Sequence, residues 1–129
     1  MNIIKVSDLA IAPNPHGVDA RMLYDVEKIQ IVYITLKPGE GLKRHVTFTD
    51  VLFYVLEGCG VVEIGDERKE VCKDTLIESP AGIPHCWYNE SDKDLRFLVI
   101  KVPRPKNRQK YFKNFNFILI ILKYKSKDK

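Results

Sequence analysis

The stretch Pro80-Ala81-Gly82-Ile83-Pro84-His85-Cys86-Trp87-Tyr88-Asn89 decides the fold class of this chain. It directly follows an apolar run, residues 75–79, that is typical of a β-strand. Pro80 and Gly82 predict a tight corner, after which the chain re-enters a strand that carries His85 beside aromatic residues. The pattern P-x-G-x-x-H-x-x-x-N therefore predicts a strand, a turn and a second strand that presents a histidine.

Short apolar or alternating runs, each ended by turn residues, fill the chain on both sides of this stretch. They cover residues 29–36, 51–56, 59–64, 68–71, 75–79, 83–88 and 95–102. No helical period separates them, so their length and spacing predict an all-β sandwich or barrel. A chain of 129 residues is long enough for one such domain and too short for two.

The barrel is expected over residues 28–105, with a flanking segment on each side. Residues 1–27 are expected to pack on the barrel or to cross to a partner subunit, and residues 20–26 are a candidate strand. Residues 106–129 form a basic and apolar tail whose apolar run is too short to span a membrane. Three interpretations of this tail stay open: an added edge strand or short helix, a docking segment for a partner subunit or a membrane surface, and an extension without a structural role.

Charge is distributed unevenly between the domain and the tail. Residues 104–129 carry nine Lys and Arg against one acid, whereas residues 1–103 carry 12 Lys and Arg against 16 Asp and Glu. We therefore expect no nucleic-acid-binding face on the domain. The first residues do not resemble a signal peptide, which predicts a cytoplasmic protein. Cys59, Cys72 and Cys86 are unequally spaced and predict free thiols in a reducing compartment.

An upstream stretch, residues 39–58, completes a two-part pattern. Within G-x5-H-x-H-x(3,4)-E-x6-G, three positions are filled as the pattern requires, by Gly39, His45 and Gly58. The two motifs, in this order, resemble those of the cupin superfamily, and the chain is similar to its small single-domain members over residues 28–103. The resemblance implies a double-stranded β-helix, the jelly-roll barrel, and the pairing of two copies into a homodimer.

The first motif departs from the family pattern at two ligand positions. Thr47 occupies the place of the second histidine, and Val51 occupies the place of the acid, with Asp50 one residue away. His45 and Thr47 lie two residues apart on one predicted strand, so we expect them to face the same side. Asp50 is expected to face away from the site unless a β-bulge re-aims it.

The intact family site implied by the resemblance holds a divalent ion between three imidazoles and a carboxylate. In this chain the candidate metal ligands are His45, His85 and Asp50, and the candidate ions are Zn, Mn, Fe and Ni. Because a threonine hydroxyl is a weak ligand, we expect weak metal binding. Two histidines that face each other in a partly apolar cavity are expected to have coupled, lowered pKa values.

The same face can instead form a pocket for a small organic molecule. Its candidate lining residues are His45, Thr47, Phe53, His85 and Trp87. Three functions therefore remain open: a small-molecule-binding cupin, a metal-dependent enzyme of isomerase or dioxygenase type, and an interaction module that uses the tail. Catalytic residues stay unassigned.

Two further residues, Cys86 and His16, have the chemistry to take part in the site. Cys86 alternates with His85 on one strand and is expected to point away from it. His16 lies in the turn Asn14-Pro15-His16-Gly17 and is interpreted as a surface residue rather than as part of the barrel mouth.

Overall fold

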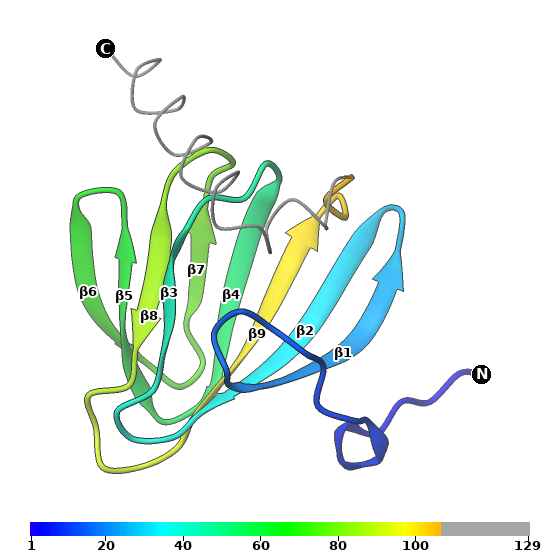
Figure 1. Cartoon of the computed structure of the whole chain (residues 1–129), viewed down its shortest axis with the longest axis horizontal. Coiled ribbons are helices and arrows are strands. Elements are labelled where there is room, and N and C mark those ends of the chain that lie inside the picture. The colour runs from blue at the N-terminus through cyan, green and yellow to red at the C-terminus, as the bar shows by residue number, and fades with distance from the viewer. Residues whose placement is uncertain (107–129) are drawn as a thin grey trace.

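The computed structural model describes residues 1–106, and nearly all regular structure in them is β-strand (Figure 1). These residues form one short 3-10 turn and nine strands: η1 (Val6–Asp8), β1 (Asp19–Val26), β2 (Ile29–Leu36), β3 (Gly41–His45), β4 (Asp50–Glu57), β5 (Cys59–Ile64), β6 (Glu67–Cys72), β7 (Leu76–Ser79), β8 (His85–Tyr88) and β9 (Leu95–Val102). The seven strands expected from the sequence are present within two residues of their expected bounds, and the candidate strand at residues 20–26 is β1. The predictions for the tail lie outside the described residues, apart from Lys106.

The strands form two antiparallel sheets that face each other. One sheet has the order β1-β2-β9-β4-β7 and the other the order β3-β8-β5-β6 (Figure 1). The chain passes back and forth between the two sheets, which is the connectivity of a jelly roll. The prediction of an all-β, double-stranded β-helix is therefore confirmed. Within residues 1–106, no helix is long and apolar enough to cross a membrane.

Alternating side chains of the central strands fill the space between the sheets. On β4 and β9 the inward residues are apolar and almost fully buried: Val51, Phe53, Val55, Leu95, Phe97 and Val99. Trp87 from the opposite sheet stacks on Phe97 with ring centroids 4.3 Å apart. Phe53 meets both rings edge-on. Burial of each such side chain stabilises the fold by about 1.5–3 kcal/mol, so this aromatic cluster is the centre of the core.

The last residue of the second motif, Asn89, ties two loops together. Its buried side-chain amide donates hydrogen bonds to the carbonyls of Leu36 at 2.9 Å and Lys93 at 2.7 Å. Its own backbone carbonyl accepts a hydrogen bond from the N–H of Gly39, in the first motif, at 2.9 Å. All of these groups lie at the end of the barrel where β2 and β8 finish. Asn89 is therefore a structural residue that fixes the two motifs relative to each other.

A disulfide joins Cys59 to Cys72, so the prediction of free thiols is wrong for this pair. The two residues lie directly opposite each other on β5 and β6, with Cα atoms 4.0 Å apart. Spacing alone did not reveal the pair, because a hairpin brings residues 13 apart into register only once its turn is known. Cys86 is free and buried.

Candidate functional site

Thr47 occupies the second-histidine position of the first motif, and Asp50 lies next to the acidic position. Both residues bind the turn at residues 80–82. The N–H of Gly82 donates to the carbonyl of Thr47 at 2.8 Å, and the N–H of Ala81 donates to Asp50 Oδ1 at 2.9 Å. Asp50 is exposed, and the pairing of β4 is regular at this end, so no bulge re-aims its carboxylate into the barrel. Val51 lies at the acidic position and is fully buried in the core.

A β-bulge in β3 aims His45 into the barrel. Leu42 lies opposite Trp87 and His45 lies opposite His85. Between these two pairs β3 contains one residue more than β8. Leu42 points inward, and strict alternation from it would turn Arg44 inward and His45 outward. The extra residue reverses this, and Arg44 is exposed while His45 meets His85 inside.

β3 ends at His45, so the alternation rule does not extend from His45 to Thr47. The expectation that both residues lie on one strand is therefore wrong. The hydroxyl of Thr47 is buried and donates to the carbonyl of Thr49 at 3.1 Å. Thr47 contributes to the turn described above through its backbone.

The imidazoles of His45 and His85 are linked in a hydrogen-bonded chain whose proton positions follow from its two ends. His45 Nδ1 lies 2.6 Å from the carbonyl of Lys43, which can only accept, so Nδ1 carries a proton and Nε2 of the neutral ring carries a lone pair. His85 Nε2, 3.1 Å away, must then donate to His45 Nε2. His85 Nδ1 in turn accepts from the hydroxyl of Ser79 at 2.7 Å. Every member is satisfied with both rings neutral.

Neutral rings are also what the electrostatics of this site favour. Burial lowers the pKa of His45 to about 4, against the favourable hydrogen bond to Lys43. Burial, followed by the charges of His45 and Lys101, holds the pKa of His85 well below its usual value. The expected lowering of both pKa values is confirmed, and desolvation is its main cause.

His16 is the third histidine of this site, so its interpretation as a surface residue is wrong. Its Nδ1 accepts a hydrogen bond from the N–H of Lys43 at 2.8 Å, and its ring lies 5.1 Å from that of His45. An accepting Nδ1 leaves the proton on Nε2, so the ring offers one donor. Burial, then the charge of His45, lowers the pKa of His16 to about 4.

The loop that carries His16 is braced by Asn14. The Oδ1 of Asn14 accepts from the backbone N–H of His16 at 3.1 Å, and its Nδ2 donates to the carbonyl of Val18 at 2.8 Å. An asparagine before proline predicts such a turn. Nothing in the sequence predicts where the turn docks, because that depends on the N–H groups of a bulged strand, β3, 27 residues further on.

A cavity of about 360 Å³ lies beside His16 and His45, between the two sheets and under the N-terminal loop. Its volume is at the small end of the range for ligand sites, roughly 300–1,000 Å³. Most of its wall is apolar and comes from β1, β2, β3 and β9: Ala20, Met22, Val32, Ile34, Leu42 and Val99. The two histidines and the backbone around Lys43 form its polar end.

The predicted lining residues are divided between this cavity and the core. His45 lines the cavity, and His85 lies behind it as its hydrogen-bond partner. Phe53 and Trp87 belong to the aromatic core, and Phe53 meets the His85 ring edge-on at 5.2 Å. Trp87 Nε1 is buried and has no hydrogen-bond partner among residues 1–106.

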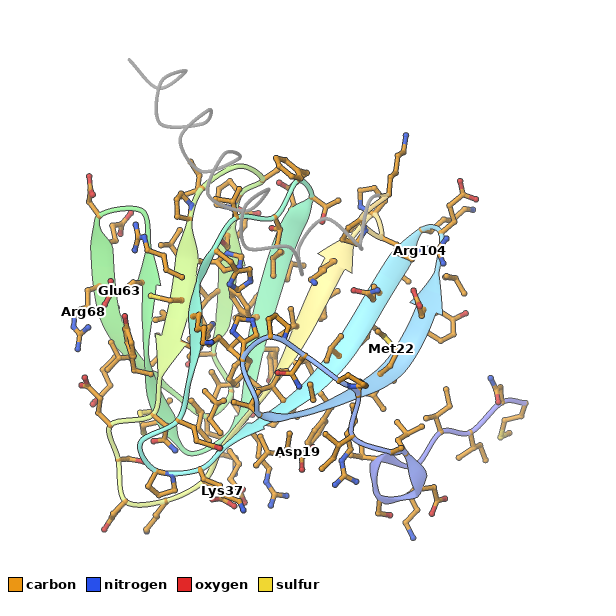
Figure 2. All side chains as sticks on the ribbon, viewed as in Figure 1. Asp19, Met22, Lys37, Glu63, Arg68 and Arg104 are labelled. Atoms are coloured by element: carbon orange, nitrogen blue, oxygen red, sulfur yellow. A yellow bond between two sulfur atoms is a disulfide. The ribbon has the colours of Figure 1, made fainter. Side chains whose placement is uncertain are left out.

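A second hollow, of about 750 Å³, lies on the opposite side, between the β5–β6 hairpin and β7. Although it is larger, its lining among the described residues contains no histidine or cysteine, and its acids and lysine are exposed. Figure 2 shows Met22, in the wall of the smaller cavity, far from the ion pair of Glu63 and Arg68 on the β5–β6 hairpin. We favour the smaller cavity, because the neutral histidines lie there.

The residues present do not fit the metal centre that the fold family implies. The two imidazole nitrogens lie 3.1 Å apart, a suitable spacing for two ligands of one ion. The remaining ligand positions hold Val51, which is buried in the core, and Thr47, whose hydroxyl is bonded within its own loop. Asp50 is engaged at the turn. Across the described part of the chain, no three His, Cys, Asp or Glu side chains are grouped so as to hold a metal ion.

The comparisons with known proteins agree with this fold. A family model described as "Cupin domain" matches residues 32–101. The chain is a cupin. It is 26% identical over 85 residues to an uncharacterized protein of Methanocaldococcus jannaschii, a match that covers 65% of this chain and 73% of the relative.

Two solved structures extend the comparison. The TT1209 protein of Thermus thermophilus is 33% identical, with a TM-score of 0.71, over 81% of this chain and all of that one. The polyketide cyclase RemF of Streptomyces resistomycificus is 22% identical, with a TM-score of 0.72, over 82% of each chain. At that identity the likeness to RemF shows the fold alone.

Proposed function

We propose that this cupin binds a small organic molecule in the cavity beside His16 and His45. The observation that carries the proposal is the combination of a half-open, mostly apolar cavity with neutral imidazoles at one end. Apolar walls with a few placed polar groups are the usual composition of small-molecule sites. The ligand would bury its apolar part against β1, β2 and β9 and meet the His16 Nε2–H donor at the polar end.

Four probes with one common body test this proposal: 3-phenylpropanol, 3-phenylpropanamide, 3-phenylpropanoate and 3-phenylpropylamine. Binding is measured by isothermal titration calorimetry and by amide shifts at Leu42 and Val99 in nitrogen-15 NMR spectra. We expect at least one probe to bind the native protein. Met22→Trp, which fills the cavity, should abolish that binding, whereas Tyr24→Trp, on the same strand and exposed, should preserve it.

Failure of all four probes to bind, or binding that survives Met22→Trp, would contradict the proposal. The alternative, a metal-dependent enzyme, requires a stoichiometric ion held by His45 and His85. Elemental analysis of untagged protein, with His85→Ala as the control, tests that alternative directly. A full equivalent of a transition metal that is lost in His85→Ala would favour it over the organic ligand.

A further inference from the structure

Lys101 lies near the end of β9, just beyond the stretch of that strand that lines the cavity. It is two residues beyond Val99, which lines the cavity, and it shares the inward face of β9 with Val99 and Phe97. Its neighbours in register are Gln30 on β2 and Val51 on β4. Lys101 is therefore a basic residue on the interior face of the barrel.

Within the described part of the chain, the amine of Lys101 has no paired counter-ion. No hydrogen bond or ion pair reaches it from any residue in the range 1–106. Asp25 is the acid whose charge acts on it, and the carboxylate of Asp25 pairs with Arg104 at 3.6 Å and accepts from Gln30 at 3.3 Å. Burial lowers the pKa of Lys101, as expected for an ammonium group taken out of water without an anion.

The positive charge of Lys101 reaches the histidine cluster. It is among the charges that lower the pKa of His16, His45 and His85. Among the described residues, no aspartate or glutamate lines the cavity, and the polar side chains that do are basic or amide in character. The cavity therefore combines an apolar wall with an excess of cationic and hydrogen-bond-donating groups at one end, and this combination favours a negatively charged group there.

We propose that the ligand of this cavity has an apolar body and one carboxylate, and that the carboxylate pairs with the amine of Lys101. This inference rests on the proposed function, since it specifies the ligand of the same site. A singly charged head matches the one ammonium group on the inward face of β9, whereas a doubly charged phosphate would leave one negative charge without a partner there. The His16 Nε2–H is available as a second donor to the same carboxylate.

The four probes and one matched pair of variants test the inference. Dissociation constants are measured by calorimetry for the native protein, for Lys101→Met, and for Lys69→Met, a control at an exposed lysine of β6. Methionine keeps an unbranched apolar stem of similar length and removes the ammonium group. We expect 3-phenylpropanoate to bind the native protein at least tenfold more tightly than the isosteric amide, and Lys101→Met to remove that preference. Lys69→Met should leave it intact.

Each other outcome overturns the inference in a recognisable way. Equal affinity for the carboxylate and the amide, or tighter binding of the amine, would show that the cavity does not select an anion. A carboxylate preference that survives Lys101→Met would place the anion elsewhere. If only a neutral probe binds, and Met22→Trp abolishes its binding, the proposed function stands while the carboxylate inference fails. If no probe binds, both fail.

Discussion

Acidification from pH 7 to pH 5 should destabilise this fold through its buried histidines. His45 has a pKa of about 4 in the folded protein against an ordinary value of 6.5. Between these values the unfolded chain binds a proton that the folded protein does not, so the free energy of unfolding falls as the pH falls. The contribution is fully present above pH 6.5 and is lost progressively as the pH falls toward 4.

The size of the effect follows from the two pKa values of His45. At pH 5 its ring is roughly 10:1 deprotonated in the fold and roughly 30:1 protonated in the unfolded chain, which lowers the free energy of unfolding by about 2 kcal/mol. His16 has a similarly lowered pKa but is partly exposed, so solvent screening reduces its contribution to about 1 kcal/mol. His85 acts in the same direction. Native domains are stable by about 5–15 kcal/mol, so a loss of about 3 kcal/mol is a large share.

Urea unfolding at pH 7, 6 and 5 measures this loss, and the fluorescence of Trp87, the only tryptophan in the chain, reports it. We expect the midpoint to fall at each step, and His45→Gln, which cannot take up a proton in this range, to show a shallower decline. A free energy of unfolding that stays constant within about 0.5 kcal/mol from pH 7 to pH 5 would refute the assignment of these rings as buried and neutral.

Three further predictions concern the framework that holds the site. Gly58→Ala should destabilise the protein by about 3 kcal/mol or more, because φ is +80° there and the added Cβ would lie 2.4 Å from a backbone oxygen. Gly39→Ala, at φ +86° but with open space around it, should cost only about 1 kcal/mol in the same urea assay. Denatured, unreduced protein should titrate with one thiol per chain, and replacing Cys59 and Cys72 by alanine should cost about 2–3 kcal/mol; three reactive thiols would contradict the disulfide. Asp50→Ala should cost about 1 kcal/mol by removing the acceptor for Ala81 N–H, and Asp50→Asn, which keeps an acceptor, should cost less; equal losses would argue against this hydrogen bond.

The strands could be predicted because their information is local. Alternation such as that of β4, and turn residues such as Gly65, mark where each strand begins and ends. The two motifs also predicted that His45 and His85 would meet, which the 3.1 Å contact confirms. Both successes rest on patterns that occupy fewer than about a dozen consecutive residues, the range over which backbone preferences act.

The parts of the site that escaped prediction depend on register between distant strands. The bulge between Leu42 and His45 changes which side chains face inward, and no residue type in that interval requires it. His16 accepts a hydrogen bond from a backbone N–H of this bulged strand. The proposed role of Lys101 depends on its facing inward from β9, close to the cavity. Alternation along β9 places Lys101 on the same face as Phe97, so the sequence does contain a signal for the inward direction of this lysine.

The hydrogen-bonded chain from Ser79 to Lys43 also bears on the choice between the two functions. A metal bound by both histidines needs a lone pair on each Nε2, whereas the chain needs a proton on His85 Nε2. The two states therefore exclude each other, and the change from one to the other requires His85 to move its proton to Nδ1 and Ser79 to accept rather than donate. Among residues 1–106 no carboxylate is grouped with the pair to favour a cation, and the charge of Lys101 opposes one, so the neutral chain is the state that these residues favour. With Thr47 bonded to Thr49 and Val51 buried in the core, neither of the two departed positions supplies a further ligand to an ion held by the histidines.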